Sequence, residues 1–329
     1  MSPRWASPPM LTCDGDPEQV RTDDARHTRA VRPVSILAID IGGTKVALRR
    51  EGAGTPPHET VVRWSEGASR SDDLALLRAA VATMGSGSRA VGVSLPATVA
   101  VSGTVTSWPN RPSWVGLDWA GFVADLFPAT PTATADDGDL AALAEAEHAG
   151  RSDVVYLGVG TGVGGGIVSD GRLLPRSGRG SCEVGHMIVA LDGPRCDCGR
   201  RGCLQGIASG PAVLRAAGAA FGQETGPEQL LDGWRAGAPW ADGAVRAAGR
   251  ALAAAVIGVG ELLRVDLAVI GGGFAAGVTD LAAVVADEVA GHARVGHPVP
   301  EVRAAALGGT SSLHGALSLA RSLRAEAVP

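Results

Sequence analysis

The sequence predicts an α/β protein of two domains, and three observations support this. The chain has 329 residues, roughly twice the usual length of one domain. At three places an apolar run that suits a buried strand ends in a glycine-rich turn, and segments with helical spacing lie between these runs. The first strand-and-turn unit also has a similar counterpart after Gly150. We therefore expect two similar halves with a boundary near Gly150.

The first half begins with an expected hairpin. The run Ser35–Asp40 predicts a strand, the glycine pair at 42–43 a turn, and Lys45–Arg49 a second strand. A helix is expected from Ser71, since apolar residues follow at helical spacing, and a further strand over Ala90–Leu95. Strand and helix then alternate, and we expect a first domain over residues 34–150.

The second half repeats this opening. Val154–Gly158 predicts a strand that runs into a turn at 160–162, and a second strand-and-turn signal follows over Gly166–Gly171. Apolar residues at helical spacing between Val245 and Leu263 predict one face of a long helix. Residues 267–270 form a last apolar run that ends in three glycines. We expect a second domain over residues 151–312.

Composition narrows the possible functions. Apolar residues make up 45% of the chain but aromatic residues only 4%, so we expect a core of Ala, Val, Leu and Ile. Glycine (47) and proline (20) together stay below the roughly 25–30% that marks a low-complexity chain. The net charge is −5 and no basic stripe is present, so nucleic acid is not expected as a partner.

No membrane partner is expected either, and we predict a cytoplasmic location. The apolar run Ala251–Leu263 is shorter than a membrane span of about 18 residues and contains Glu261. Residues 1–33 are rich in Pro, Asp and Arg, unlike the apolar region of a signal peptide. We interpret them as a disordered extension, which a start at Met10 would shorten.

The first glycine turn has the composition of a phosphate site. Asp40 closes a strand, and Gly42 and Gly43 let the backbone approach a ligand closely. Thr44 and Lys45, the only lysine of the chain, follow directly and suit phosphate oxygens. An ordinary tight hairpin is the alternative for this motif alone. The further glycine segments at 160–164 and 271–273 favour a nucleotide held by several turns, although none has the P-loop pattern.

Three cysteines and a histidine suit a structural metal. One imidazole and three thiolates complete a closed tetrahedral zinc site, which leaves no position for an activated water. Free buried cysteines are the alternative, and Cys13 and Cys182 receive no role. The predicted zinc ligands are His186, Cys196, Cys198 and Cys203.

An acidic cluster precedes a predicted helix that starts near Leu140. Phosphoryl transfer to an alcohol needs a carboxylate near the attacking oxygen, and Asp136, Asp137 and Asp139 supply candidates. The helix dipole is expected to keep these carboxylates ionised. We interpret Asp139 as the helix N-cap because it lies directly before the apolar face.

Residues 35–321 resemble the ROK family (repressors, open reading frames, sugar kinases) of the actin-like ATPase superfamily. The resemblance rests on the three glycine motifs, on Glu183–His186 and, most specifically, on Cys196–Cys203. It implies a two-domain, ribonuclease H-like fold with ATP and sugar in an interdomain cleft. It also implies Mg²⁺, a structural Zn²⁺, a homodimer, and a C-terminal helix at about residues 313–325 that returns to the first domain.

The resemblance also implies roles for individual residues. Asp137 matches the family's residue that takes the proton from the substrate hydroxyl, and Asp40 would hold Mg²⁺. His186 would bind zinc with one ring nitrogen and face the substrate with the other. The ATP contacts implied are Gly42, Gly43, Thr44, Lys45, Gly160, Thr161 and Gly162, with Gly271, Gly272 and Gly273 on the adenosine side. The acceptor contacts implied are Asn110, Asp136, Glu183, His186 and Gln205.

Two acceptor positions depart from the family pattern: Asp136 stands for the usual Asn, and Gln205 for the usual Glu. The donor and acceptor pattern therefore changes, since an amide can donate where a carboxylate only accepts. The sequence thus predicts an ATP-dependent kinase acting on a primary hydroxyl of a hexose or sugar-like polyol, with a C7-cyclitol of secondary metabolism as one candidate.

Other functions remain as alternatives. An ordinary glucokinase with neutral substitutions is the first of them. A sugar-sensing pseudokinase is disfavoured because Asp40, Asp137 and the glycine turns are present. A repressor of this family would need a DNA-binding domain before the first strand, and residues 1–33 are too short and lack helical periodicity.

Overall fold

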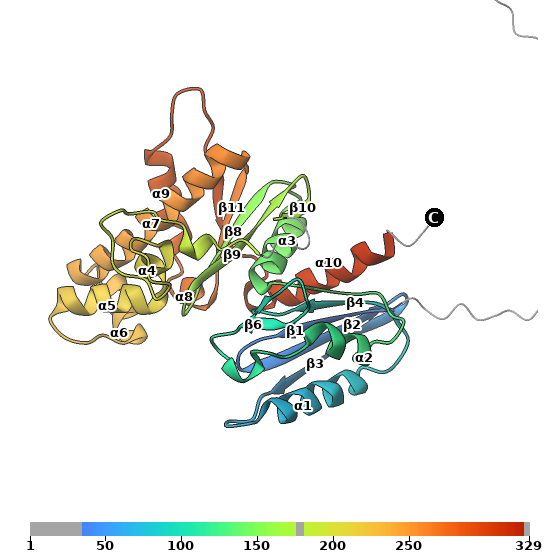
Figure 1. Ribbon diagram of the computed structural model, residues 1–329. Helices are drawn as coiled ribbons and strands as arrows, with labels where there is room; N and C mark the ends of the chain where they lie inside the picture. Colours follow the sequence, from blue (N-terminus) through green and yellow to red (C-terminus); the bar gives the residue numbers. More distant parts are fainter. Residues whose placement is uncertain (1–34, 176–180, 326–329) are drawn as a thin grey trace, which may run out of the picture. The chain divides into compact units, whose positions relative to one another are not determined.

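The computed structural model describes residues 35–175 and 181–325, and the extension expected over residues 1–33 lies outside them. Two five-stranded sheets of the same plan form the framework (Figure 1). In each sheet the first strand is followed on one side by two strands that each pair antiparallel with their neighbour. On its other side lie two strands that each pair in parallel with their neighbour. The repeat expected from the two similar openings is thus present in the topology.

The N-terminal sheet has the order β3-β2-β1-β4-β7. Its strands are β1 (Ser35–Ile41), β2 (Lys45–Gly52), β3 (Thr55–Arg63), β4 (Ser88–Ser94) and β7 (Thr132–Ala135). Helices α1 (Arg70–Thr83) and α2 (Trp119–Leu126) accompany it, with the short ribbon of β5 (Thr98–Val99) and β6 (Val105–Ser107) and the 3₁₀ turn η1 (Pro112–Trp114). Of these, β3, β5, β6, β7, α2 and η1 had no counterpart in the sequence prediction.

The C-terminal sheet has the order β10-β9-β8-β11-β12. Its strands are β8 (Val154–Val159), β9 (Val163–Ser169), β10 (Arg172–Leu174), β11 (Leu267–Gly271) and β12 (Glu301–Ala304). Its helices are α4 (Leu204–Ala208), α5 (Gly210–Phe221), α6 (Pro227–Arg235), α7 (Pro239–Leu263), α8 (Gly273–Gly277) and α9 (Leu281–Gly291). The 3₁₀ turns η2 (Val184–His186) and η3 (Gly308–Thr310), and helices α3 (Asp137–Ala149) and α10 (Ser311–Ala325), complete the described chain.

Strand β1 shows how alternation of side chains builds layers on both faces of a sheet. Leu37, Ile39 and Ile41 point to the face covered by α1 and α2, where the tryptophans cluster. Ile36 and Ala38 point to the opposite face and pack with side chains of α3 and α10. Because both faces are covered, the strand reads as a continuous apolar run in the sequence.

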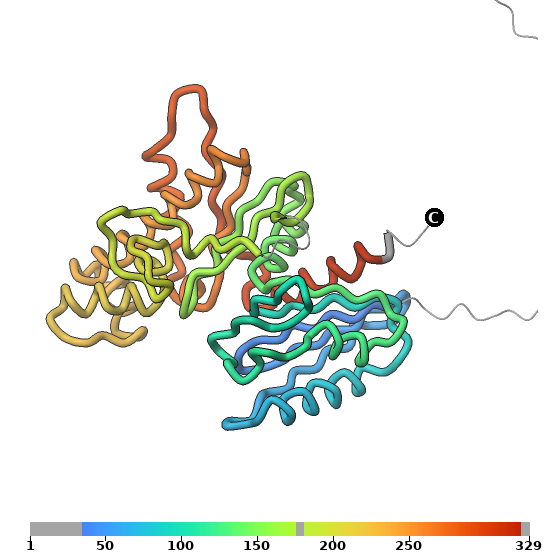
Figure 2. Tube along the Cα trace, in the orientation of Figure 1, coloured from blue at the N-terminus to red at the C-terminus, as the bar shows by residue number. Residues whose placement is uncertain are grey.

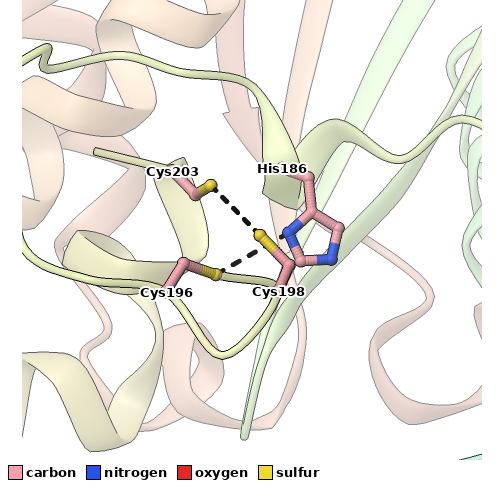
Figure 3. Close-up of side chains that lie close together, drawn as sticks. All are labelled: His186, Cys196, Cys198 and Cys203. Atoms are coloured by element: carbon pink, nitrogen blue, oxygen red, sulfur yellow. Dashed lines mark hydrogen bonds between the residues drawn. The ribbon is translucent and has the colours of Figure 1, made fainter. Parts of the chain in front are cut away.

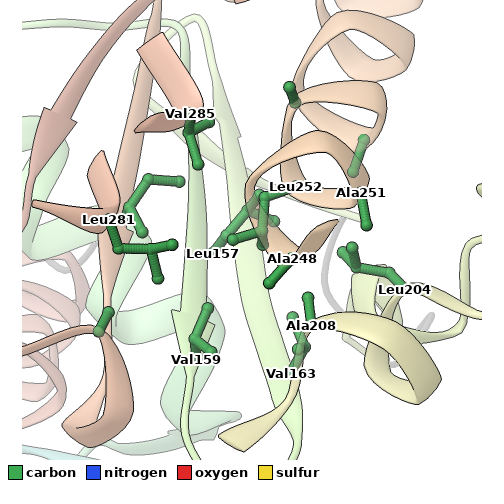
Figure 4. Close-up of a cluster of buried hydrophobic side chains, with 14 of the residues drawn as sticks. Leu157, Val159, Val163, Leu204, Ala208, Ala248, Ala251, Leu252, Leu281 and Val285 are labelled. Carbon is green, nitrogen blue, oxygen red and sulfur yellow. The ribbon is translucent and has the colours of Figure 1, made fainter. Parts of the chain in front are cut away.

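Small residues dominate the core of the C-terminal sheet. Leu157 and Val159 of β8 meet Ala248 and Leu252 of α7, as Figure 4 shows. Helix α7 has the length and composition of a membrane-crossing helix, but 61% of its most apolar stretch is buried inside the protein, which is typical of a core helix. It begins earlier than the apolar spacing predicted, at Pro239, whose fixed φ suits the first helical turn.

Helices α3 and α10 connect the two sheets. The opposite face of β8, with Val154 and Tyr156, packs on α3, and α10 packs on β1 and β4 and lies along α3 (Figure 2). These approaches depend on glycine. A Cβ atom at Gly92 of β4 would lie 1.9 Å from the carbonyl oxygen of Ala316, and one at Gly315 of α10 would lie 2.0 Å from that of Leu140.

We therefore expect Gly315→Ala to destabilise the protein although alanine favours helices. The added methyl group would force α10 away from α3, at a cost of roughly 1–3 kcal/mol in the free energy of unfolding. The matched control is Gly243→Ala in α7, where no atom lies within 4 Å of the new methyl group, and it should stabilise by up to about 1 kcal/mol. Urea denaturation measures both. Equal stabilisation by the two substitutions would contradict the close contact.

Candidate active site and metal centre

The first predicted phosphate turn lies between β1 and β2. The N–H of Gly42 donates to the carbonyl oxygen of Lys45 at 2.9 Å and closes the turn. Gly43 faces Asn110, since a Cβ atom on Gly43 would lie 3.0 Å from the Asn110 Cβ. Thr44 and Lys45 are exposed. The turn therefore brings an expected acceptor residue, Asn110, beside the expected phosphate residues.

The acidic cluster begins α3, but its cap differs from the prediction. Asp136 is the N-cap: its backbone is extended, and its side chain accepts a hydrogen bond from the N–H of Gly138 at 3.0 Å. The assignment of Asp139 as N-cap was wrong. Asp139 lies within the first turn of the helix, and its side chain is buried, with a relative exposure of 6%. Its Oδ1 has no hydrogen-bond partner among the described residues. Asp136 is the cap because the helix begins at Asp137, about one turn before its apolar face.

Burial dominates the electrostatics of this cluster. It raises the pKa of Asp137, against the opposing effect of the Gly138 N–H. It also raises the pKa of Asp136 to about 8, with further contributions from Asp137, Asp139 and Glu183. The pKa of Asp139 rises to about 7 for the same first reason. The expectation that the helix end keeps these carboxylates ionised was therefore wrong, because loss of hydration outweighs the helix dipole here.

Asp40 belongs to the same electrostatic group. Burial raises its pKa to about 6; the nearby Ser94 hydroxyl opposes this shift, and the charge of Asp137 adds to it. Ser94 lies at the end of β4, where it pairs with Asp40 of β1, and its side chain is fully buried. Lys45 lowers the pKa of Asp40 slightly. Asp40 of β1 and Asp137 at the start of α3 are thus close enough for their charges to interact.

The start of α3 also touches the second glycine segment. A Cβ atom on Gly138 would lie 2.7 Å from the carbonyl oxygen of Gly165, and one on Gly166 would lie 2.6 Å from the Cα of Asp139. Both distances are too short for any larger residue to keep this backbone contact. The glycines of β9 therefore permit the close approach of the start of α3, which carries Asp137, to this strand.

The second and third glycine segments are neighbours. Strands β8 and β11 pair in parallel, with Gly158 opposite Gly271, so their carboxyl ends meet at one edge of the sheet. The N–H of Gly160 donates to the carbonyl oxygen of Gly162 at 2.9 Å, which closes a turn with Thr161 at its centre. Gly272 has φ of +90° and sits against the Val159 backbone, where a Cβ atom would clash at 2.5 Å. Gly273 begins α8.

The remaining acceptor candidates surround β9. The Gln205 Oε1 accepts a hydrogen bond from the N–H of Val163 at 3.3 Å. The NH₂ group of Gln205 takes no part in this hydrogen bond. Gly185, inside the segment Glu183–His186, faces the carbonyl oxygen of Val163. Glu183 acts on the pKa of Asp136 and Asp139. Backbone and side-chain contacts thus join β9 to the start of α3 and to Gln205, and charge interactions relate the carboxylates to one another.

The predicted zinc ligands converge in the loop before α4 (Figure 3). All four ligand atoms lie within 4.8 Å of one another. The sulfurs of Cys198 and Cys203 are 3.7 Å apart, and the His186 Nδ1 lies 3.8 Å from the sulfur of Cys196. Tetrahedral zinc with bonds of about 2.3 Å to sulfur separates two such sulfurs by about 3.8 Å, so the donor set fits the ion.

Local structure explains this convergence. Cys196 and Gly199 close a tight turn through an N–H to carbonyl hydrogen bond of 2.9 Å. Gly199 and Gly202 adopt φ of +89° and +71°, conformations that favour glycine. The Arg200 backbone N–H lowers the pKa of Cys198, which favours the thiolate that a metal binds. Because Nδ1 of His186 faces the thiols, Nε2 points away from them (Figure 3).

Two surface hollows lie elsewhere. One of about 480 Å³ lies beside α2 and β7, between Trp119 and Thr134. The other, of about 740 Å³, lies along α5 and the loop that ends at Thr225. Neither is lined by a predicted site residue.

Four residues near the site were missed by sequence reasoning: Trp64, Asp73, Ser94 and Arg111. Arg111 directly follows Asn110, but its partner Asp73 is 38 positions away, so no local pattern joins them. Only Ser94 could have been found from the sequence, because it lies near the end of a predicted strand, as Asp40 does in its own strand.

These features define a class of protein before any relative is considered. Paired sheets of one plan, glycine turns beside buried carboxylates and a closed thiolate site are what the actin-like fold of the ATP-dependent sugar kinases provides. The chain belongs to the ROK family, whose model matches residues 36–323. The recognition of this family and the predicted fold class are confirmed.

Named relatives include several sugar kinases. The chain is 48% identical over 297 residues to a kanosamine kinase of Amycolatopsis mediterranei, covering 89% of this chain and 98% of that protein. A ROK hexokinase from Thermus thermophilus matches with a TM-score of 0.76 and 27% identity, over 89% of this chain and 100% of the other. A Streptomyces griseus ROK glucokinase in complex with glucose and AMPPNP matches with a TM-score of 0.66 and 27% identity, over 88% and 99%.

We expect the purified protein to hold about one zinc ion per chain, since four ligands complete the coordination. Cys198→Ser should lose most of this zinc and lower the melting temperature. The control is Cys182→Ser, because the thiol of Cys182 lies 2.9 Å from the Leu174 carbonyl oxygen, outside the cluster. Mass spectrometry of the metal content measures both. Full zinc content in the Cys198 variant would refute this ligand.

Proposed function

We propose that this protein is an ATP- and Mg²⁺-dependent kinase that phosphorylates a primary hydroxyl group of an amino-bearing hexose. One observation carries the proposal: Asp137, buried at the start of α3, lies beside both Asp40 and the glycines of β9, in a chain 48% identical to a kanosamine kinase. A buried carboxylate near Asp40, which precedes a candidate phosphate turn, suits phosphoryl transfer to an alcohol.

Asp137 is the proposed base. A buried carboxylate with a raised pKa accepts a proton more readily than an exposed one. The hydroxyl oxygen of the acceptor would attack the terminal phosphorus of ATP, with ADP leaving, while Asp137 takes the hydroxyl proton. Backbone N–H groups at residues 42–44 and 160–162 would hold phosphate oxygens.

Asp40 is the proposed magnesium residue. Its donor set fits, since Mg²⁺ prefers carboxylate oxygens, waters and phosphate oxygens, and Asp40 and Asp137 offer two carboxylates within electrostatic range of each other. When bound, Mg²⁺ neutralises charge on the phosphates. Asp40 orients it, and its own ionisation is favoured once a cation faces it.

Zinc at His186 and the three cysteines is proposed as structural. Its role for the reaction would be to fix the His186 ring, whose Nε2 points away from the thiols. We further propose that residues 34–150 with α10 form one domain and residues 151–312 the other, with ATP and the acceptor held between them. The packing of α10 on β1 and β4 supports this return of the chain to its first half.

An amino group on the acceptor explains the surplus of carboxylates. The charges of Asp137, Asp139 and Glu183 add to the burial that raises the pKa of Asp136, and the described residues supply only one opposing contact, the Gly138 N–H. An ammonium group facing Asp136 would relieve this repulsion and hold the carboxylate in its charged form. We therefore propose Asp136 as the residue that recognises the amine, with Asn110, Glu183, His186 and Gln205 as contacts for hydroxyl groups.

A C7-cyclitol is the second candidate acceptor, and Gln205 is the observation that favours it. Because its Oε1 accepts from Val163, the NH₂ group is the part of the amide that remains as a donor. A ring ketone would accept a hydrogen bond from this group, whereas an anomeric hydroxyl also offers a proton that needs an acceptor.

We also propose a cytoplasmic homodimer with no nucleic-acid or membrane partner. The family resemblance supports the dimer. The exposed side chains of Ile188 and Leu191, beside the metal centre, add apolar surface of the kind that subunit contacts cover.

Asp137→Ala should lower kcat by at least about 100-fold, because the acceptor loses its base. Circular dichroism and zinc content should match those of the unchanged protein. The control is Asp139→Asn, another buried carboxylate of the same helical turn, which we expect to lower kcat less than about tenfold. The opposite ranking of the two variants would move the base from Asp137 to Asp139.

A substrate panel tests the acceptor. ADP release would be measured with ATP and, in turn, kanosamine, glucose, N-acetylmannosamine and a C7-cyclitol ketone. We expect kcat/KM to be highest for kanosamine, and Asp136→Asn to lower its advantage over glucose by roughly 10–100-fold, since a charge-assisted hydrogen bond contributes about 1.5–3 kcal/mol.

Asparagine at 136 still caps α3, so the fold should persist. Glucose as the best substrate of the unchanged protein would favour the glucokinase alternative, and the ketone as the best would favour the cyclitol. An unchanged kanosamine preference in the Asp136→Asn variant would remove Asp136 from amine recognition.

A further inference from the structure

The carbonyl groups of the first phosphate turn are held by side chains from outside the turn. The indole Nε1 of Trp64 donates to the carbonyl oxygen of Gly42 at 2.8 Å. The Nε of Arg111 donates to the carbonyl oxygen of Gly43 at 3.3 Å. Two successive peptide units are therefore fixed in orientation by groups that are remote in sequence.

This fixation determines where the N–H groups of the turn point. In a trans peptide the carbonyl and the following N–H lie in one plane and point in opposite directions. With the Gly42 and Gly43 carbonyls directed at Trp64 and Arg111, the N–H groups of Gly43 and Thr44 are directed away from these side chains. Neither N–H donates to a backbone carbonyl elsewhere in the described chain. Both are thus free to bind phosphate oxygens.

Arg111 and Trp64 are themselves anchored. Arg111 forms an ion pair with Asp73, which is 1% exposed and also accepts from the Trp114 Nε1 at 3.0 Å. The Arg111 guanidinium carbon lies 4.5 Å from the centre of the Trp64 ring, a cation–π geometry. Asp73 lies in the first turn of α1, where the helix dipole favours a carboxylate. The anchor is therefore built on a rigid element.

The same residues link the phosphate turn to the expected acceptor site. Arg111 directly follows Asn110, and the Asn110 side chain lies over Gly43. A shift of Arg111 would therefore move the carbonyl of Gly43 and the side chain of Asn110 together. The geometry couples the position of the phosphate turn to that of the acceptor residue.

We propose that Asp73, Arg111 and Trp64 form a brace that aims the N–H groups of Gly43 and Thr44 at the phosphates of ATP and sets their position relative to Asn110. All three are positioning residues, since they act through the backbone of the turn. This inference rests on the proposed kinase function.

The test compares two tryptophans of the same aromatic cluster. Trp64→Phe keeps an aromatic ring but removes the hydrogen bond to Gly42. Trp119→Phe likewise removes one hydrogen bond, from Nε1 to the Thr134 hydroxyl at 3.0 Å. This hydrogen bond does not involve the phosphate turn. Both should lower the melting temperature. Only Trp64→Phe should raise the KM for ATP and the dissociation constant of AMPPNP, by about fivefold for one lost hydrogen bond.

The KM for the acceptor should stay within about twofold in Trp64→Phe, since Arg111 still holds Asn110 in place. Arg111→Lys should raise both KM values, because one ammonium group cannot donate to Asp73 and to Gly43 in the fork geometry of a guanidinium. Loss of kinase activity is not part of the expectation for either variant.

An unchanged ATP KM and AMPPNP affinity in Trp64→Phe would overturn the brace, as would an equal change in Trp119→Phe. So would an Arg111→Lys variant in which the KM for ATP is unchanged. Absence of kinase activity from the unchanged protein, with AMPPNP still bound, would instead refute the proposed function, and the AMPPNP comparison would still decide the brace.

Discussion

The close contact between the start of α3 and the glycines of β9 is the constraint on which the rest of the site depends. Gly138, Gly165 and Gly166 leave no room for a Cβ atom at this contact. Without it the start of α3, which carries Asp137, could not lie against β9. The same helix packs along α10, which rests on the N-terminal sheet through Gly92. Small residues therefore set the relation between the carboxylate and the phosphate turns.

This geometry has an electrostatic cost. The contact buries Asp136, Asp137 and Asp139 together, and each pKa rises chiefly because the charged form loses hydration. Cations reverse this effect, which gives Mg²⁺ near Asp40 and an ammonium group near Asp136 a common physical basis. A site that is unfavourable for its own charges is thereby favourable for cationic ligands.

Rigidity around the turns has a different origin in the two halves. In the N-terminal half, the side chains of Trp64 and Arg111 hold the turn from outside, and Asp73 of α1 anchors Arg111. In the C-terminal half, backbone contacts dominate, since Gly160 pairs with Gly162 and with the N–H of Gly210. The two sheets share a topology, but their turns are supported by unrelated interactions.

The sequence by itself determined the α/β class, the repeated opening, the glycine turns and the candidate metal ligands, because each depends on local spacing: apolar runs of strand length, glycine at sharp turns, and thiols within one loop. Only the tertiary structure decided which aspartate caps α3, how far burial shifts the carboxyl pKa values, and that Asp73 anchors Arg111 from 38 positions away. Those properties depend on what surrounds a side chain, and packing between distant segments creates those surroundings.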